Sequence, residues 1–420
     1  MMNILWTTNI TLPSIAEQAG LEIETKEGWL TTLANSIINE HDVRLCVVSF
    51  APSLKEPLIG VCNKIYYYII PTCFFIKKNN DKLRAIARQI DQEFNPNLMH
   101  INGTEYGYAL QLLPLLKVQS VISIQGLVSV CSRFLFTGFS FPYLFKHPLF
   151  LGWLYRNFTD YVNRGKNEIK YFNTVGHAVG RTEWDKVHVK QINPQIIYHH
   201  CDESMRPSFF KEKWDIHKII RHQIYISQAS YQIKGLHLIL DAIAELKVCY
   251  PDLRVVIAGK NPLQYSSSLS ERIKSHFDYG YYLKSLMKKK GLMDTICFVG
   301  NQKEEDVARL MLQSHVTIVP STIENSPNSM CEAQCLGLPC VASYVGGTPD
   351  LSENGTLSPL YRCEEWEMLV EHIRRIFDSD DYAQSLSERA REVAIKRNSQ
   401  KNNSNVMAEI YRQIINQETK

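Results

Sequence analysis

Two glutamates, Glu324 and Glu332, stand eight residues apart around a Pro-Asn-Ser turn in the stretch ENSPNSMCE. Glu324 follows the apolar run HVTIVPS, which is typical of a buried strand. Glu332 falls about one turn inside a helix that we expect to begin near residue 328. Ligands of open α/β sheets bind at the carboxyl ends of the strands. A carboxylate at each of these two places can accept hydrogen bonds from sugar hydroxyls.

The residues between the two glutamates indicate a helix start that faces the same ligand. Ser326, Pro327, Asn328 and Ser329 are of the types that cap a helix or occupy its first turn. The free amide donors and the positive dipole end of such a helix suit a diphosphate. The alternative is two solvated glutamates, and the spacing alone does not decide between the two interpretations.

Short apolar runs alternate with longer amphipathic segments along the whole chain. The apolar runs predict strands at 3–7, 43–50, 64–70, 97–101, 120–124, 172–180, 223–227, 253–259, 295–300, 315–321 and 339–343. The amphipathic segments predict helices at 29–41, 81–94, 235–249, 281–290, 303–313, 328–337 and 378–417. This alternation predicts an α/β protein with parallel sheets and helices on both faces.

A chain of 420 residues is longer than one core usually holds. We therefore expect two doubly wound, Rossmann-like domains at 1–203 and 204–395, joined by a linker near 200–206. A last helix at 396–420 completes the chain, and packing back on the first domain is one arrangement open to it.

Composition narrows the class of protein. A net charge of +3 gives no case for nucleic-acid binding. Eleven cysteines without a C-x-x-C pair favour a reducing compartment, hence the cytoplasm. Neither a G-x-G-x-x-G fingerprint nor a P-loop occurs, which argues against a dehydrogenase or a P-loop NTPase. The crowded stretch YHHCDE lacks metal-ligand spacing, so we expect no metal site.

The aromatic segment 134–155 breaks the alternation, with two prolines and two glycines that make it too interrupted to span a bilayer. One interpretation is a loop folded onto the core of the first domain, because large apolar patches rarely stay exposed. The other is an interfacial patch that contacts a membrane or a lipid-borne substrate. The basic residues that follow, up to position 170, favour contact with anionic lipid.

The stretch ENSPNSMCEAQCLGLPCVASYVGGTPD resembles the Glu-x7-Glu signature of family 4 glycosyltransferases, which are retaining enzymes with the GT-B fold. The resemblance implies that Glu324 faces the donor sugar and that Glu332 holds the nucleotide ribose. It covers most of residues 220–360. Further positions match the family's pattern after the second glutamate: Gly337, Pro339, Gly346 and Gly347.

The segment YISQASYQIKGLHLILDAIAEL resembles the part of the family that neutralises the diphosphate leaving group. Lys234 fits the family's lysine, whereas Gln228 or Ala229 stands where an arginine is usual. Gly259 and Gly300 match strand ends that frame the nucleotide base. The resemblance also implies catalysis without a metal, with the nucleotide-sugar as co-substrate and no cofactor.

The first half resembles a bacterial subgroup that builds surface polysaccharides. Gly28 keeps the role of a small residue near the donor phosphate, and Gln125 stands where many members carry a histidine. Within the matching pieces we expect acceptor contacts from Glu105, His177 and Arg181.

Together these features predict transfer of a sugar from a nucleotide-diphosphate-sugar to a growing, lipid-linked glycan. Contact with the inner face of the membrane would run through 134–170. Two alternatives remain open: a nucleotide-sugar epimerase of the same architecture, and a non-catalytic protein that binds sugar nucleotides.

Overall fold

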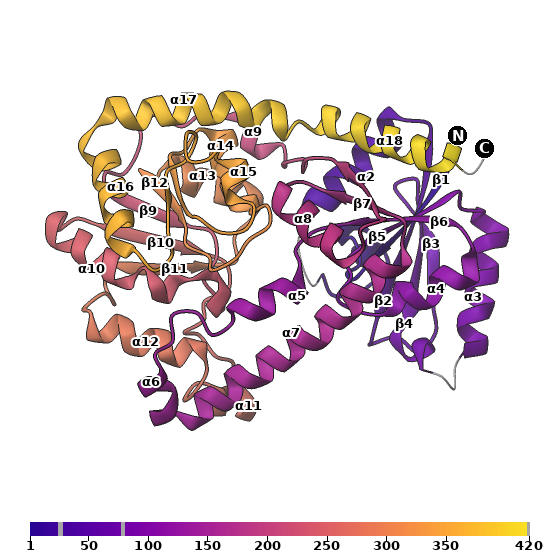
Figure 1. The fold of residues 1–420 in the computed structure, drawn as a ribbon, viewed down its shortest axis with the longest axis horizontal. Helices are drawn as coiled ribbons and strands as arrows, with labels where there is room; N and C mark the ends of the chain where they lie inside the picture. Colours follow the sequence, from indigo (N-terminus) through magenta and orange to yellow (C-terminus); the bar gives the residue numbers. More distant parts are fainter. Residues whose placement is uncertain (24–27, 77–79, 418–420) are drawn as a thin grey trace. The chain divides into compact units, whose positions relative to one another are not determined.

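The computed structural model describes residues 1–23, 28–76 and 80–417. The chain divides into two compact units. Unit 1 comprises Met1–Ser129, Asn163–Met205 and Arg397–Lys420, and unit 2 comprises Val130–Val162 and Arg206–Lys396. Each unit is built on one sheet (Figure 1).

The sheet of unit 1 has the strand order β3-β4-β2-β1-β5-β6-β7-β8 among the described residues. All neighbouring strands are parallel except β3 and β4. The strands are β1 (Met2–Thr8), β2 (Val43–Ala51), β3 (Leu58–Cys62), β4 (Ile65–Pro71), β5 (Leu98–Asn102), β6 (Gln119–Ser123), β7 (His177–Gly180) and β8 (Ile197–His200). The central strands β1 and β5 are buried along most of their length, which explains their near-continuous apolar sequence.

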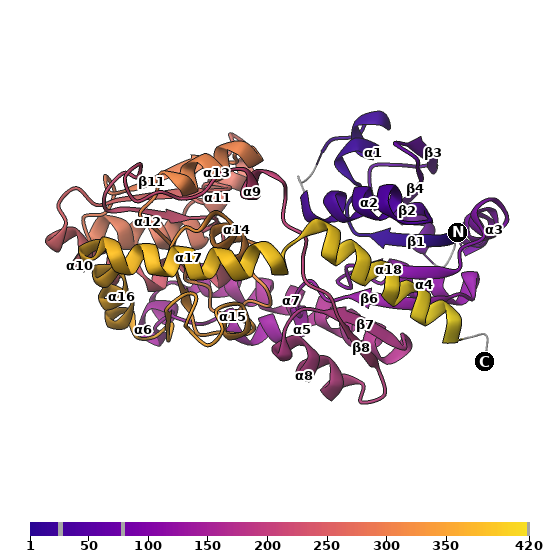
Figure 2. The ribbon, with the colours of Figure 1, turned by 90° about the horizontal axis from the view of Figure 1, so that it is seen from above.

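The helices of unit 1 include one from the far end of the chain. They are α1 (Pro13–Gln18), α2 (Gly28–Glu40), α3 (Asn80–Phe94), α4 (Tyr108–Leu116), α5 (Val128–Cys131), α8 (Glu183–Ile192) and α18 (Gln400–Gln417). Helix α18 packs against α2 and β5 (Figure 2). A buried chain of hydrogen bonds holds it there: Tyr411 bonds to Trp6 at 3.0 Å and to His100 at 2.6 Å.

The sheet of unit 2 is parallel, with the strand order β11-β10-β9-β12-β13-β14 among the described residues. Its strands are β9 (Gln223–Ile226), β10 (Arg254–Ala258), β11 (Ile296–Gly300), β12 (Val316–Val319), β13 (Cys340–Ser343) and β14 (Leu360–Tyr361). Its helices are α6 (Phe141–Lys146), the first part of α7 (Pro148–Thr174), α9 (Ser208–Lys211), α10 (Leu240–Cys249), α11 (Leu269–Lys274), α12 (Tyr279–Lys289), α13 (Glu304–Leu312), α14 (Asn328–Leu336), α15 (Thr348–Leu351), α16 (Trp366–Asp378) and α17 (Asp380–Arg397).

The prediction of two Rossmann-like halves is confirmed, and most predicted strands agree with the observed ones within two residues. The strand predicted at 172–180 was too long, because α7 continues to Thr174 and β7 begins only at His177. Residues Tyr171 and Phe172 are buried on that helix, and a short apolar run does not tell a buried helix end from a strand.

The assignment of 134–155 to the first domain was wrong. This segment belongs to unit 2, where it forms α6 and the start of α7. A proline stands in the first turn of each of these helices, Pro142 and Pro148, so the prolines begin helices and do not interrupt one. In the described part of the chain, no helix combines the length and the apolar character that crossing a membrane requires.

Candidate active site

The predicted donor residues of unit 2 gather where its strand order reverses. From β9 the chain continues to β10 on one side, while β12 pairs with β9 on the other side. The carboxyl ends of β9 and β12 therefore flank a topological switch point, where open α/β sheets bind ligands. Lys234 lies on the loop after β9, and Glu324 lies on the loop after β12.

These two side chains form an ion pair. The Lys234 Nζ lies 2.5 Å from Glu324 Oε1. The Ser321 hydroxyl donates a second hydrogen bond to the same oxygen at 2.7 Å. The two loops are tied together directly, because the Thr322 amide donates to the Ile233 carbonyl at 2.8 Å. The carboxylate and the ammonium are thus held in a fixed geometry before any ligand binds.

Two glycines allow the loops to approach this closely. Gly235 has a φ of +70°, and a Cβ on it would lie 1.9 Å from the Pro320 carbonyl oxygen. Gly346 has a φ of +52°, and a Cβ there would lie 1.7 Å from the Glu324 carbonyl oxygen. The next residue, Gly347, donates its amide to that oxygen at 3.1 Å. Any other residue at Gly235 or Gly346 would push apart the backbone that positions the ion pair.

Electrostatics keep Lys234 charged. Burial alone would lower its pKa, but the neighbouring Glu324 and Tyr231 outweigh burial, so the pKa is raised above its ordinary value. The Tyr231 ring also lies beneath the ammonium, with Nζ 5.8 Å from the ring centroid. A permanent cation at the switch point can neutralise an anionic ligand or leaving group.

Helix α14 supplies the second part of this site. It begins at Asn328, and Pro327 at its N-cap position has no side-chain oxygen to cap the helix. Its first turn therefore leaves amide donors for a ligand. Ser326 and Ser329 flank this start, as predicted from the sequence.

Glu332 lies in the second turn of α14 and already has a partner. Its Oε1 lies 2.5 Å from a guanidinium nitrogen of Arg206. The Arg206 guanidinium also lies over the Phe209 ring, 4.9 Å from its centroid. Sequence reasoning missed Arg206, because it stands 126 residues before Glu332 and belongs to no motif.

The predicted glycines at the strand ends also adopt special conformations. Gly259 and Gly300 have φ values of +88° and +74°. The amide of Gly259 donates to the carbonyl of Gly300 at 2.9 Å, next to an irregularity in the β10–β11 register. Gln228, at the place of the family's arginine, bonds only to the nearby Ser230 hydroxyl at 3.3 Å among the described contacts. Gln228 therefore supplies no charge for a diphosphate.

In unit 1 the predicted residues Glu105, Gln125 and Arg181 follow three neighbouring strands, β5, β6 and β7. The ends of these parallel strands meet at one edge of the sheet. Glu105 accepts a hydrogen bond from Asn9, which follows β1. The switch point of this sheet lies between β1 and β5, so Glu105 is placed beside it.

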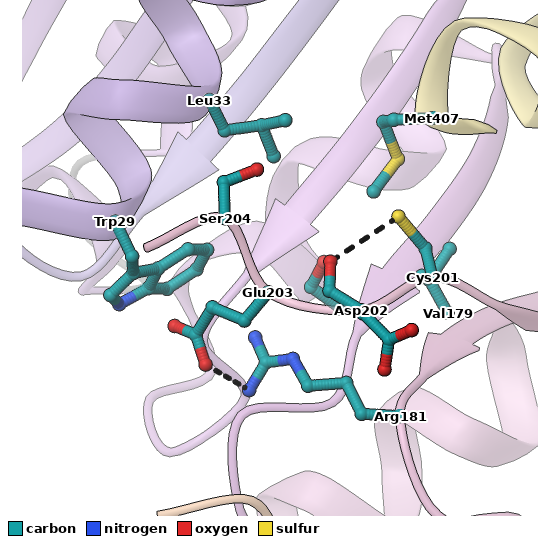
Figure 3. A pocket seen from close by; sticks show the side chains of 10 residues that line it. Trp29, Leu33, Val179, Arg181, Cys201, Asp202, Glu203, Ser204 and Met407 are labelled. Carbon is teal, nitrogen blue, oxygen red and sulfur yellow. Dashed lines mark hydrogen bonds and ion pairs between the residues drawn. The ribbon is translucent and has the colours of Figure 1, made fainter. Parts of the chain in front are cut away.

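Arg181 is closed in by its own unit. Its guanidinium lies 3.0 Å from Glu203, and it lies 5.4 Å from the centroid of the Trp29 ring. Figure 3 shows both side chains at a small pocket of about 20 Å³, which is room for little more than a water molecule. Gly28 begins the helix that carries Trp29. The pocket as it stands does not admit a sugar.

His177 does not join this edge. It is the first residue of β7 and pairs with Val121, whereas Arg181 follows the last residue of that strand. Its ring contacts the ring of His199 on β8, with 3.0 Å between Nδ1 and Nε2. The structure thus separates His177 from Gln125 and Arg181 by the length of the strand, because its sequence position gave no strand boundary.

Glu168 is a site residue that sequence reasoning missed. This buried carboxylate of α7 accepts hydrogen bonds from the amides of Val128 and Ser129, at 2.8 and 3.1 Å, and from the Ser129 hydroxyl. Burial raises the pKa of Glu168 to about 7, although these hydrogen bonds lower it. Glu168 therefore holds the loop that carries Gln125.

Comparison with known proteins agrees with the geometry of unit 2. Residues 210–393 match the model of the family described as glycosyl transferases group 1. Lys234, Glu324 and Glu332 all fall within this match. The D-inositol 3-phosphate glycosyltransferase of Corynebacterium urealyticum is 28% identical over 185 residues, which are 44% of this chain and 41% of that protein. The chain thus spans less than half the length of this curated relative.

Solved structures resemble the chain over nearly its full length. Sucrose-phosphate synthase from Thermosynechococcus elongatus matches with a TM-score of 0.71 at 14% identity, covering 99% of both chains. HepE from Anabaena, solved in complex with UDP-glucose, matches with a TM-score of 0.66 at 15% identity, covering 98% of this chain and 100% of that one. At such identities the likeness shows the fold, which is the two-unit GT-B fold.

Proposed function

We propose that this protein is a glycosyltransferase that moves a sugar from a nucleotide-diphosphate-sugar to an acceptor glycan. The observation that carries the proposal is the Lys234–Glu324 ion pair at the switch point of unit 2. It stands inside the region that matches glycosyl transferases group 1 and on the same loop that leads into α14.

The chemistry of the reaction explains why such a pair is needed. When the sugar leaves, its oxocarbenium-like centre gains positive charge and the departing diphosphate gains negative charge. In the proposed mechanism Lys234 and the amides at the start of α14 stabilise the diphosphate. Glu324 orients the sugar hydroxyls, and Glu332 does the same for the ribose.

We further propose that the reaction retains the anomeric configuration without a covalent enzyme intermediate, with the leaving phosphate helping to deprotonate the acceptor. No metal or cofactor enters this mechanism, in which fixed cations of the protein neutralise the diphosphate. The closed Arg181–Glu203 pair supports transfer over epimerisation, because epimerisation needs acid–base carboxylates in unit 1 that can reach the substrate.

The acceptor in this proposal is a lipid-linked glycan of a bacterial surface polysaccharide, glycosylated in the cytoplasm at the inner face of the membrane. The resemblance of the first half to that subgroup supports the acceptor. Because HepE was solved with UDP-glucose, UDP-sugars are the donors to test first.

The first experiment measures thermal shifts with a panel of nucleoside diphosphates and their sugars. We expect one nucleotide to raise the Tm of the wild type. Glu332→Ala should remove this shift, because its carboxylate would no longer bind the ribose. Glu305→Ala, an exposed carboxylate on α13 of the same unit, is the matched control and should keep it.

The second arm measures product formation with the nucleotide-sugar that the first arm selects. Glu324→Gln should lower transfer about 10²–10³-fold, in line with the loss of one oriented polar group in an active site. If no nucleotide raises the Tm, the donor site is refuted. If a nucleotide binds but neither transfer nor epimerisation is seen, the protein is a sugar-nucleotide binder.

A further inference from the structure

An apolar ridge projects from unit 2. We use this name for Phe141 and Phe145 of α6 together with Leu149 in the first turn of α7. These side chains are 77%, 77% and 68% exposed. They follow one another at intervals of four residues, which is the spacing of one helix face. Three large apolar side chains on one exposed face exceed the scattered single residues of an ordinary protein surface.

The ridge stands on a well-packed base. On the opposite side of the same segment, Phe139, Tyr143 and Phe150 surround the ring of Tyr282 on α12, with ring centroids 4.8–5.4 Å apart (Figure 1). Phe139 also stacks on His237 at 4.9 Å. The segment has therefore buried one set of aromatic side chains while it presents another set to the outside.

Charge around the ridge has one sign. The sequence contains no Asp or Glu from residue 106 to residue 159. Lys146 and Arg156, both exposed, are the cations that flank the ridge on its own segment. The exposed positions of α12, the helix that carries the base, include three lysines and no carboxylate. A protein partner of mixed charge finds no complement here, whereas an anionic lipid surface does.

We propose that the apolar ridge inserts into the interfacial layer of an anionic bilayer, with Lys146 and Arg156 on the lipid phosphates. Aromatic and aliphatic side chains above a cationic face are the features of segments that lie in the membrane interface. This deepens the proposed function, on which it rests for the lipid-linked acceptor, but the binding itself does not require catalysis. Arg164, Lys166 and Lys170 of the predicted stretch belong to unit 1 and take no part in it.

The test is co-sedimentation of the full chain with vesicles of phosphatidylcholine alone or mixed with phosphatidylglycerol. We expect the wild type to bind the mixed vesicles and to lose binding as salt rises. The variant Phe141→Ser/Phe145→Ser/Leu149→Ser should bind about tenfold or more weakly. Lys146→Glu/Arg156→Glu should weaken binding about fivefold for each cation.

Three controls separate insertion of the ridge from a general loss of surface apolar area, from a failed donor site and from self-association. Val248→Ser/Met368→Ser removes two other exposed apolar side chains of unit 2 and should leave vesicle binding unchanged. Nucleotide-induced thermal shifts of the ridge variant should equal those of the wild type, so a failed donor site is seen independently. Equal vesicle binding by the ridge variant overturns the proposal. So does sedimentation of the wild type as a dimer that the ridge variant dissolves, because the ridge would then bind a second copy.

Discussion

Both units place ion pairs at the carboxyl edges of their sheets, but they enclose them to different degrees. In unit 2 the side chains of Lys234 and Glu324 are 21% and 15% exposed. In unit 1 those of Arg181 and Glu203 are 9% and 2% exposed. A partly exposed pair can exchange its partner for a ligand. A closed pair has lost its water on both sides, so its main effect is on the stability of the fold.

The difference also explains which charges sequence reasoning could interpret. The donor residues of unit 2 lie on short loops that follow apolar strands, with glycines at fixed offsets, and all of these are local signals. Arg181 carries the same local signal, but whether it meets a ligand depends on Glu203 and Trp29, which contact it across the fold. We therefore predict that mutations at the two edges separate stability from binding.

The largest effect should come from breaking the closed pair. Glu203→Ala leaves the Arg181 guanidinium buried without its carboxylate, which costs about 3–5 kcal/mol in proteins. We expect urea unfolding to show a loss of that size, and Arg181→Met/Glu203→Leu to recover most of it. Glu392→Ala, which removes an exposed i,i+4 pair with Lys396, should cost less than about 1 kcal/mol. An equally small cost for Glu203→Ala would erase the distinction between the two edges.

Much of the fold was predictable because its parallel strands are buried and its helices are amphipathic. The runs at β1, β2, β5 and β10 have few polar residues, since both faces of these strands are covered. The exposed hairpin strand β3 escaped prediction, because its burial alternates and its sequence LIGVC is short.

Long-range contacts were beyond the sequence pattern. The partner of segment 134–155 is Tyr282, more than a hundred residues away, and no periodicity records it. The same holds for Arg206, which pairs with Glu332 only after the chain has folded. Single residues that meet across the fold leave no spacing in the sequence to detect.

A smaller effect should appear in the pH dependence of unit 1. Glu168 has a pKa of about 7 in the folded protein, raised by burial from 4.5. Its contribution to stability is complete below the unfolded pKa and is lost as the pH rises through about 7. A rise from 4.5 to about 7 corresponds to roughly 3 kcal/mol at most.

The uncharged variant Glu168→Gln isolates this effect. We expect the free energy of unfolding of the wild type to fall, relative to the variant, between pH 5 and pH 8. Urea unfolding of both proteins at four or more pH values measures it. Parallel pH profiles would show that the carboxyl is not protonated in the folded state. The enclosed character of unit 1 would then be weaker than the Arg181–Glu203 pair suggests.

The open pair of unit 2 predicts a change in binding with little change in stability. Lys234→Ala removes a cation from the proposed diphosphate site, so the affinity for the nucleoside diphosphate should fall by about 1.5–3 kcal/mol. The Tm without ligand should change little, because Glu324 keeps its hydrogen bond from Ser321 and some contact with water. Isothermal titration calorimetry measures the affinity, and Lys284→Ala, an exposed lysine of α12, is the matched control. The nucleoside monophosphate should lose less affinity than the diphosphate, because the ammonium would serve the phosphate next to the sugar. A Lys234→Ala protein that binds the diphosphate as tightly as the wild type, or that loses stability instead, would place Lys234 outside the donor site and make its pair with Glu324 as structural as the closed pair of unit 1.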